Sequence, residues 1–114
     1  MKLYKRKDFL ELPEKTIYSR FSESELCIGL FCKLDKSNID FTEQDLISEG
    51  GFPNNINDGT EAYFYQMNKR DSFENFKTDL DCAGRDGMFD ENDKFIVWDK
   101  SDIKKLCDYL GNCL

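Results

Sequence analysis

The chain has 114 residues, which suits one domain that buries about two-thirds of the surface exposed by its unfolded form. Hydrophobic residues make up 39% of the sequence, which excludes a disordered chain, and the lack of His removes the commonest general base and zinc ligand. The formal net charge is −7, and residues 1–20 carry +3, so the remaining residues carry −10. Such a field disfavours direct nucleic-acid binding and anionic membranes, and it favours basic protein surfaces or serves solubility alone.

The cysteines predict a reducing compartment. Their number, five, is odd, and the N-terminal residues contain no apolar segment of the kind found in signal peptides, so we expect a cytoplasmic protein. No apolar run approaches the about 20 residues needed to cross a bilayer. Cys27 and Cys32 lie five positions apart on an expected strand and therefore point to opposite faces. We expect no metal site and no other cofactor.

The first third of the chain favours strands. Asp8 is expected to cap a short turn that Pro13 ends. Thr, Ile and Tyr favour strands, and they predict one strand from Thr16 to Phe21, followed after a polar link by a second strand over 26–34. Alternate apolar residues of this second strand share a face that is predicted to form the core: Leu26, Ile28, Leu30, Cys32 and Leu34.

The rest of the chain alternates helices with strands. Thr42 is typical of the N-cap of a short helix that ends at Gly50-Gly51. A loop is expected over 52–59, a third strand over 62–67 and an amphipathic helix over 72–80. Residues 95–98 are apolar on both faces, as in an interior strand. Ser101 is expected to cap a final helix, whose apolar stripe is predicted to belong to the core together with Trp98: Ile103, Leu106, Cys107 and Leu110.

These elements predict one α+β domain over residues 1–114. Strands joined by links too short for a crossover must pair antiparallel, as in residues 16–34. We therefore expect a largely antiparallel sheet of about four strands, with short helices packed on one face and a C-terminal helix.

The most polar segment, Asp79–Asp90, partly imitates a calcium-binding loop. Asp79, Asp81, Gly84 and Asp90 take its first, third, sixth and twelfth places. Ala83, however, stands at the fifth place, where a ligand is needed, and a strand follows where a helix is required. The segment is therefore interpreted as a turn, with a small metal-assisted hydrolase as the alternative. No catalytic residue is predicted.

The candidate binding residues lie in and before this turn. Arg85 is an isolated cation whose guanidinium suits bidentate contacts, and with Asp86 and Asp90 it is predicted to form part of a binding surface. The alternative is that Arg85 only pairs with Asp81, Asp86 or Asp90. Tyr63 and Tyr65 share one face of the expected strand, where they either stack on a ligand or belong to the core.

Two regions of the sequence resemble small, mostly uncharacterised proteins of tailed phages and prophages. The matching runs are RKDFLELP at 6–13, TIY at 16–18, RDGMFD at 85–90, FIV at 95–97 and DI at 102–103. The resemblance implies an accessory protein, a class rich in inhibitors of host enzymes and of bacterial defence systems. We therefore expect a non-catalytic protein in the host cytoplasm that inhibits or sequesters a host protein with a basic surface. The alternative ligand is a small nucleotide signal.

Overall fold

The computed structural model describes residues 1–36, 39–47, 83–85 and 89–114. The expected loop at 52–59, strand at 62–67 and helix at 72–80 lie outside these residues. The described elements, in chain order, are β1 (Lys2–Lys5), α1 (Arg6–Leu10), β2 (Ile17–Arg20), β3 (Ile28–Lys36), β4 (Phe41–Ile47), β5 (Ala83–Arg85), β6 (Lys94–Val97) and α3 (Lys100–Asn112).

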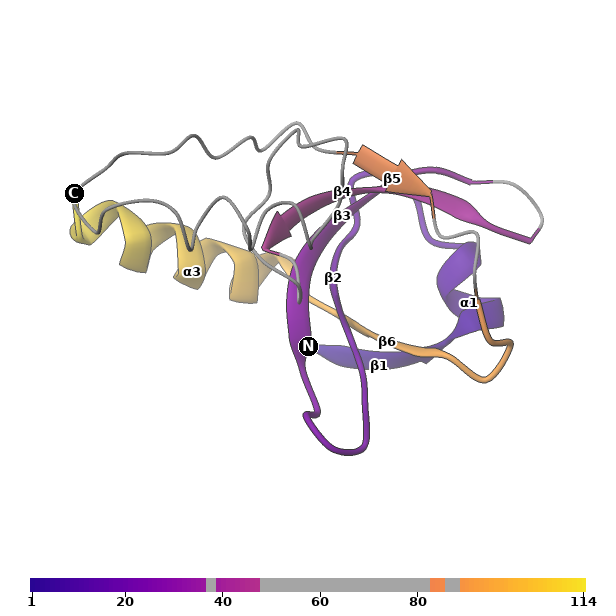
Figure 1. Ribbon diagram of the computed structural model, residues 1–114. Coiled ribbons are helices and arrows are strands. Elements are labelled where there is room, and N and C mark those ends of the chain that lie inside the picture. Colours follow the sequence, from indigo (N-terminus) through magenta and orange to yellow (C-terminus); the bar gives the residue numbers. More distant parts are fainter. Residues whose placement is uncertain (37–38, 48–82, 86–88) are drawn as a thin grey trace, which may run out of the picture.

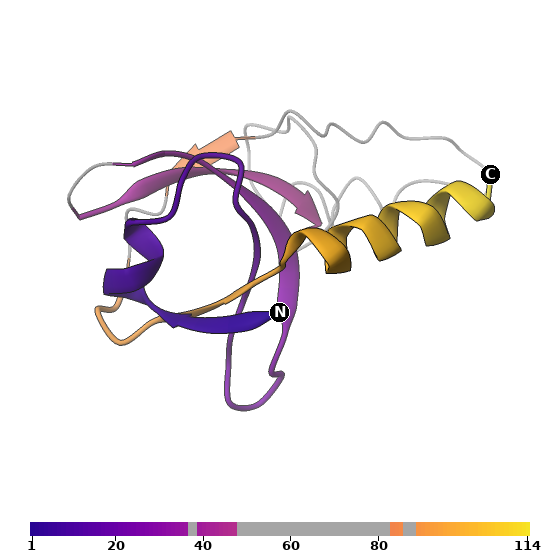
Figure 2. The ribbon, with the colours of Figure 1, turned by 180° about the vertical axis from the view of Figure 1, so that it is seen from behind.

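The strands form one strongly curled sheet. Their order is β1-β6-β2-β3-β4-β5, and every neighbouring pair is antiparallel. Figures 1 and 2 show the sheet bending into an incomplete ring, with α1 on the side opposite β2. The α+β class, the antiparallel sheet and the C-terminal helix are thus confirmed, and the described part of the sheet has six strands instead of about four.

An aromatic core fills the ring. Its buried members are Phe9, Tyr18, Phe31, Phe41 and Phe95. The Phe9 ring stacks on Phe95 at 4.1 Å between centroids and meets Tyr18 edge-on at 4.8 Å. Because Phe9 belongs to α1, these contacts fasten the helix to the sheet. Asp8, the expected cap, lies within the first turn of α1, whose N-cap is Lys5.

The predicted inner face of β3 is wrong. Phe31 and Lys33 point into the ring and are buried, while the apolar residues expected in the core are only partly buried or exposed. The Lys33 ammonium donates to the carbonyl oxygens of Phe9, Leu10 and Leu12 at 3.1, 3.0 and 2.6 Å. The last carbonyls of a helix lack intrahelical partners, and Lys33 supplies them from the sheet. Because of these hydrogen bonds, Lys33 lies on the buried face of β3, which the alternation of the sequence had predicted to carry only apolar side chains.

The helix predicted from Thr42 is also wrong, because residues 41–47 form β4 between β3 and β5. The local N-cap pattern is overridden by pairing with β3. In that pairing Phe41 enters the core and Glu43 lies opposite the inward-facing Lys33. The inner face of β4 thus carries Phe41, Glu43 and Asp45 at the two-residue period of a strand.

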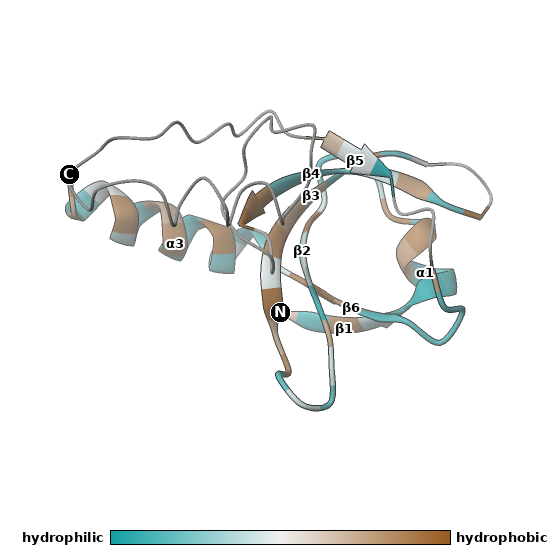
Figure 3. Ribbon diagram, in the orientation of Figure 1, coloured by the Kyte–Doolittle hydropathy of each residue, from teal (hydrophilic) through white to brown (hydrophobic). Residues whose placement is uncertain are grey.

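The C-terminal strand and helix are confirmed, but the placement of the helix differs. β6 lies between β1 and β2, as expected of a strand that is apolar on both faces. The N-cap of α3 is Asp99, which accepts from the backbone N–H of Asp102 and from the Ser101 hydroxyl. No residue of α3 is buried, so its apolar stripe is not core, and Trp98 is only partly buried. Hydrophobic and hydrophilic residues recur along α3 as it projects from the ring (Figure 3). In the described ranges no helix is long and apolar enough to span a membrane.

Candidate functional site

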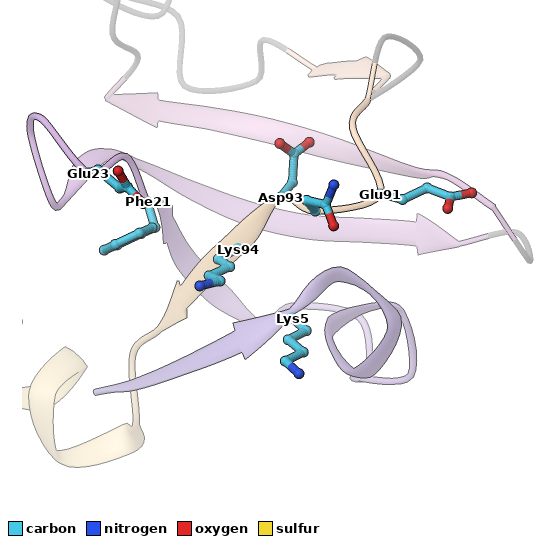
Figure 4. A pocket seen from close by; sticks show the side chains of 7 residues that line it. Lys5, Phe21, Glu23, Glu91, Asp93 and Lys94 are labelled. Atoms are coloured by element: carbon cyan, nitrogen blue, oxygen red, sulfur yellow. The ribbon is translucent and has the colours of Figure 1, made fainter.

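A cleft opens where the turn at residues 90–93 enters β6. It has a volume of about 500 Å³, and three separate parts of the chain supply its walls. The lining residues are Lys5, Phe21, Glu23, Glu91, Asn92, Asp93 and Lys94 (Figure 4). We call this the β6 cleft.

The turn that forms one wall of the β6 cleft is held by hydrogen bonds. The backbone N–H of Asp90 donates to the Asp93 carboxylate at 3.1 Å, and that of Asn92 donates to the Asp90 carboxylate at 2.8 Å. The backbone N–H of Arg6 donates to the Asp93 carbonyl at 3.1 Å, which ties the turn to α1. Glu91 lies exposed between these anchored residues. The wall is therefore fixed, and it presents a carboxylate to solvent.

The opposite wall carries an aromatic ring. The backbone N–H of Phe21 donates to the Lys94 carbonyl at 3.3 Å, which fixes residue 21 beside β6. The Lys94 ammonium lies 5.9 Å from the centroid of the Phe21 ring, within the range of a cation–π contact. Lys5 is the register partner of Lys94 in the β1–β6 pair.

The charges of the β6 cleft favour a cationic ligand. Glu23, Glu91 and Asp93 supply three carboxylates, against the ammonium groups of Lys5 and Lys94. The cleft therefore has an excess of one negative charge, within a chain whose net charge is −7. The lining thus combines carboxylates, ammonium groups and one aromatic ring.

A second group of polar residues, the interior cluster, lies on the inner face of the curled sheet: Tyr18, Arg20, Glu43 and Asp45. The Tyr18 hydroxyl donates to the Glu43 carboxylate, and Arg20 donates to both of its oxygens at 3.1 and 3.0 Å. The Arg20 guanidinium lies 5.5 Å from the centroid of the Phe31 ring. Glu43 thus accepts from two side chains of β2 and links β4 to β2, which is a structural role.

Asp45 is the member of this cluster whose charge is least favoured. Burial raises its pKa above the ordinary value of 3.8, the neighbouring Glu43 carboxylate raises it further, and Arg20 opposes both effects. The folded environment therefore disfavours the ionised form of Asp45, and this destabilising contribution develops as the pH rises from 3.8 to the raised pKa and is complete above it. Below pH 3.8 the contribution is absent, because the carboxyl is protonated in both states.

Replacement of this charge tests the sign. We expect Asp45→Asn to raise the melting temperature at pH 7, and we expect the gain to shrink toward zero below about pH 3.8. Thermal melts between pH 3 and pH 8 measure this, with Asp35→Asn as the exposed control. A lower melting temperature for Asp45→Asn at pH 7 would contradict the assignment of Asp45 as an unfavourably placed charge.

The predicted binding residues fall in different places. Arg85 in β5 forms an ion pair with Asp40 at 3.0 Å, an acid outside the three that the sequence suggested as its partners. Asp90 lies beside the β6 cleft, where its carboxylate caps the turn. The other predicted binding residues, Tyr63, Tyr65 and Asp86, lie outside the described residues, as do Asp79 and Asp81 of the acidic segment. In the ranges that the structure describes, no group of three acidic or cysteine side chains is placed to hold a metal ion.

The residues of the β6 cleft were not predicted as a site. Phe21 closes an expected strand, Glu23 belongs to an expected polar link, and Lys94 precedes the strand at 95–98. These residues come together only because β6 pairs with both β1 and β2. No short sequence motif predicts this strand order. The sequence signal nearest to the cleft was the acidic segment that ends at Asp90. It indicated the chain just before β6, but it did not indicate Lys5, Phe21 or Glu23 as neighbours.

Comparison with known proteins adds no homologue to this description. The chain matches no protein-family model, and no curated protein or solved structure is significantly similar to it.

Proposed function

We propose that this chain is a non-catalytic binding protein that holds a basic surface of another protein at the β6 cleft. The observation that carries the proposal is a cleft of about 500 Å³ whose lining combines the Phe21 ring with three acidic residues and two lysines. The resemblance to phage accessory proteins supplies the setting of the proposal: an inhibitor or sequestering protein of phage or prophage origin, with a host protein, such as a component of a defence system, as the partner.

The physical basis is complementarity of charge. A partner whose surface is built to bind a phosphate backbone carries exposed Lys and Arg, and an acidic protein attracts that surface as the backbone does. Phe21 adds specificity, because an Arg or Lys side chain buries its aliphatic stem against an aromatic ring. The hydrogen-bonded turn at 90–93 holds Asp93 in place before binding, which lowers the entropic cost of association.

The same charges disfavour a nucleotide as the ligand. A nucleotide signal would bring its phosphates toward Lys5 and Lys94, but it would also meet Glu23, Glu91 and Asp93 in the same cleft. The metal-assisted alternative depends on Asp79, Asp81 and Asp86, which lie outside the described residues.

A pull-down from a bacterial lysate tests the proposal. We expect a basic protein to be retained at about 50 mM salt and released at about 500 mM, because screening weakens attraction between exposed charges. Glu91→Lys should abolish retention at low salt, whereas Glu14→Lys, an exposed charge reversal outside the cleft, should leave it intact. Equal retention by the two variants would contradict binding at the β6 cleft.

A further inference from the structure

A second cavity lies on the other side of Glu91. It has a volume of about 300 Å³ and is lined by Arg6, Lys7, Leu10, Ile39, Phe89 and Glu91. Glu91 lines both this cavity and the β6 cleft, so the two cavities adjoin at this residue. We call the second cavity the turn pocket.

Arg6 holds the turn pocket together. Its guanidinium lies 3.8 Å from the centroid of the Phe89 ring and donates to the Ile39 carbonyl at 2.8 Å. Arg6 is only 3% exposed, so its guanidinium is buried among protein groups and has little contact with solvent. One arginine thus joins α1 to Ile39, two residues before β4, and to Phe89, the residue before the turn at 90–93. The pocket has structural support independent of any ligand.

The surface offered by the turn pocket is mainly apolar. Leu10 and Phe89 are partly exposed there, and Ile39 is 65% exposed. The exposed Lys7 adds a positive charge to the rim, which repels a second cation and directs the ligand's cation toward Glu91. An uncharged apolar side chain fits the remaining lining.

We infer that the turn pocket receives an apolar side chain adjacent to the basic side chain bound at Glu91, so that the partner is recognised by a Lys or Arg with an apolar neighbour. This inference rests on the proposed function and specifies the chemistry of the partner segment. Attraction to the shared Glu91 carboxylate places the cation, and the adjoining apolar lining places the neighbour.

Small amides test the pairing without an identified partner. The probes are N-acetyl-argininamide and the dipeptide amides N-acetyl-leucyl-argininamide and N-acetyl-arginyl-leucinamide, titrated into ¹⁵N-labelled protein. We expect at least one dipeptide to bind about tenfold more tightly than argininamide, since burying a leucine side chain contributes at least that much. The amide signals of Leu10, Ile39 and Phe89 should shift only with the dipeptide.

Two variants separate the cavities. Ile39→Ser should remove the gain from the leucyl group and leave argininamide binding unchanged, because Arg6 contacts the Ile39 backbone carbonyl and not its side chain. Glu91→Lys should weaken both probes. Argininamide binding with no leucyl gain, or a gain that survives Ile39→Ser, overturns the inference while the β6 cleft stands. Failure of argininamide to bind the unaltered protein contradicts both proposals.

Discussion

Lys33→Met should destabilise the protein by about 3–5 kcal/mol, a large part of the stability of a small domain. The ammonium of Lys33 is completely buried and bonds to three carbonyls at the end of α1. Methionine matches the length of the side chain but donates no hydrogen bond, so these carbonyls would lose their charged donor. Urea denaturation followed by circular dichroism gives the difference in the free energy of unfolding.

Lys7→Met is the matched control, because Lys7 is exposed on the same helix. Its effect should stay within about 0.5 kcal/mol, as for most surface substitutions. If Lys33→Met costs no more than this control, the helix end is satisfied by water and Lys33 does not hold α1 on the sheet.

Phe9→Ala should cost about 3–5 kcal/mol, because it removes the ring at the centre of the aromatic core. Phe9 is completely buried and contacts Tyr18, Phe41 and Phe95 at centroid distances of 4.8, 5.2 and 4.1 Å. The substitution leaves a cavity between α1 and the sheet, so α1 should lose protection from amide hydrogen exchange before the strands do.

Tyr109→Ala removes an aromatic ring of similar size from α3, where the residue is 72% exposed. Its cost should be below about 0.5 kcal/mol. Comparable losses for Phe9→Ala and Tyr109→Ala would mean that α1 is not fastened through the core.

The fold class was predictable because its signals are local. The β-branched and aromatic residues at 17–20 and the apolar run at 95–97 form strands as expected, and the short link between residues 20 and 28 enforces an antiparallel pair. The helix after Asp99 follows its periodicity. The predicted burial of this helix in the core was wrong. An apolar stripe shows that a helix is amphipathic, but it does not show which surface covers the stripe.

The errors in the fold arise where a distant partner determines the structure. Thr42 and Asp45 satisfy a local helix-start pattern, yet Phe41 gains a buried place only when residues 41–47 lie beside β3. The alternation places Lys33 on the solvent face, and only the carbonyls of Phe9 and Leu10 in α1 and of Leu12 just after it explain its burial. In both cases a tertiary contact outweighs a preference worth less than about 1 kcal/mol per residue.

The candidate site was predictable only in part. The segment up to Asp90 was predicted to belong to a binding surface, and Asp90, its last residue, shapes the turn at 90–93. The identity of the cleft depends on sheet order, which places Lys5 and Phe21 beside Lys94 from positions far apart in the chain. Arg85, the cation expected to orient a ligand, forms an ion pair with Asp40, the residue before β4, while its side chain remains 66% exposed. Its binding role stays a prediction.

Photo-crosslinking from position 21 is the most direct test of binding at the β6 cleft. A benzophenone amino acid in place of Phe21 keeps an aromatic ring in the wall of the cleft, and the same group at position 109 samples the exposed surface of α3. After irradiation in a bacterial lysate at low salt, we expect a basic protein to be joined to the chain from position 21, and to be lost when Glu91→Lys is added. A crosslink that forms from position 109 and not from position 21 would contradict the β6 cleft as the binding site.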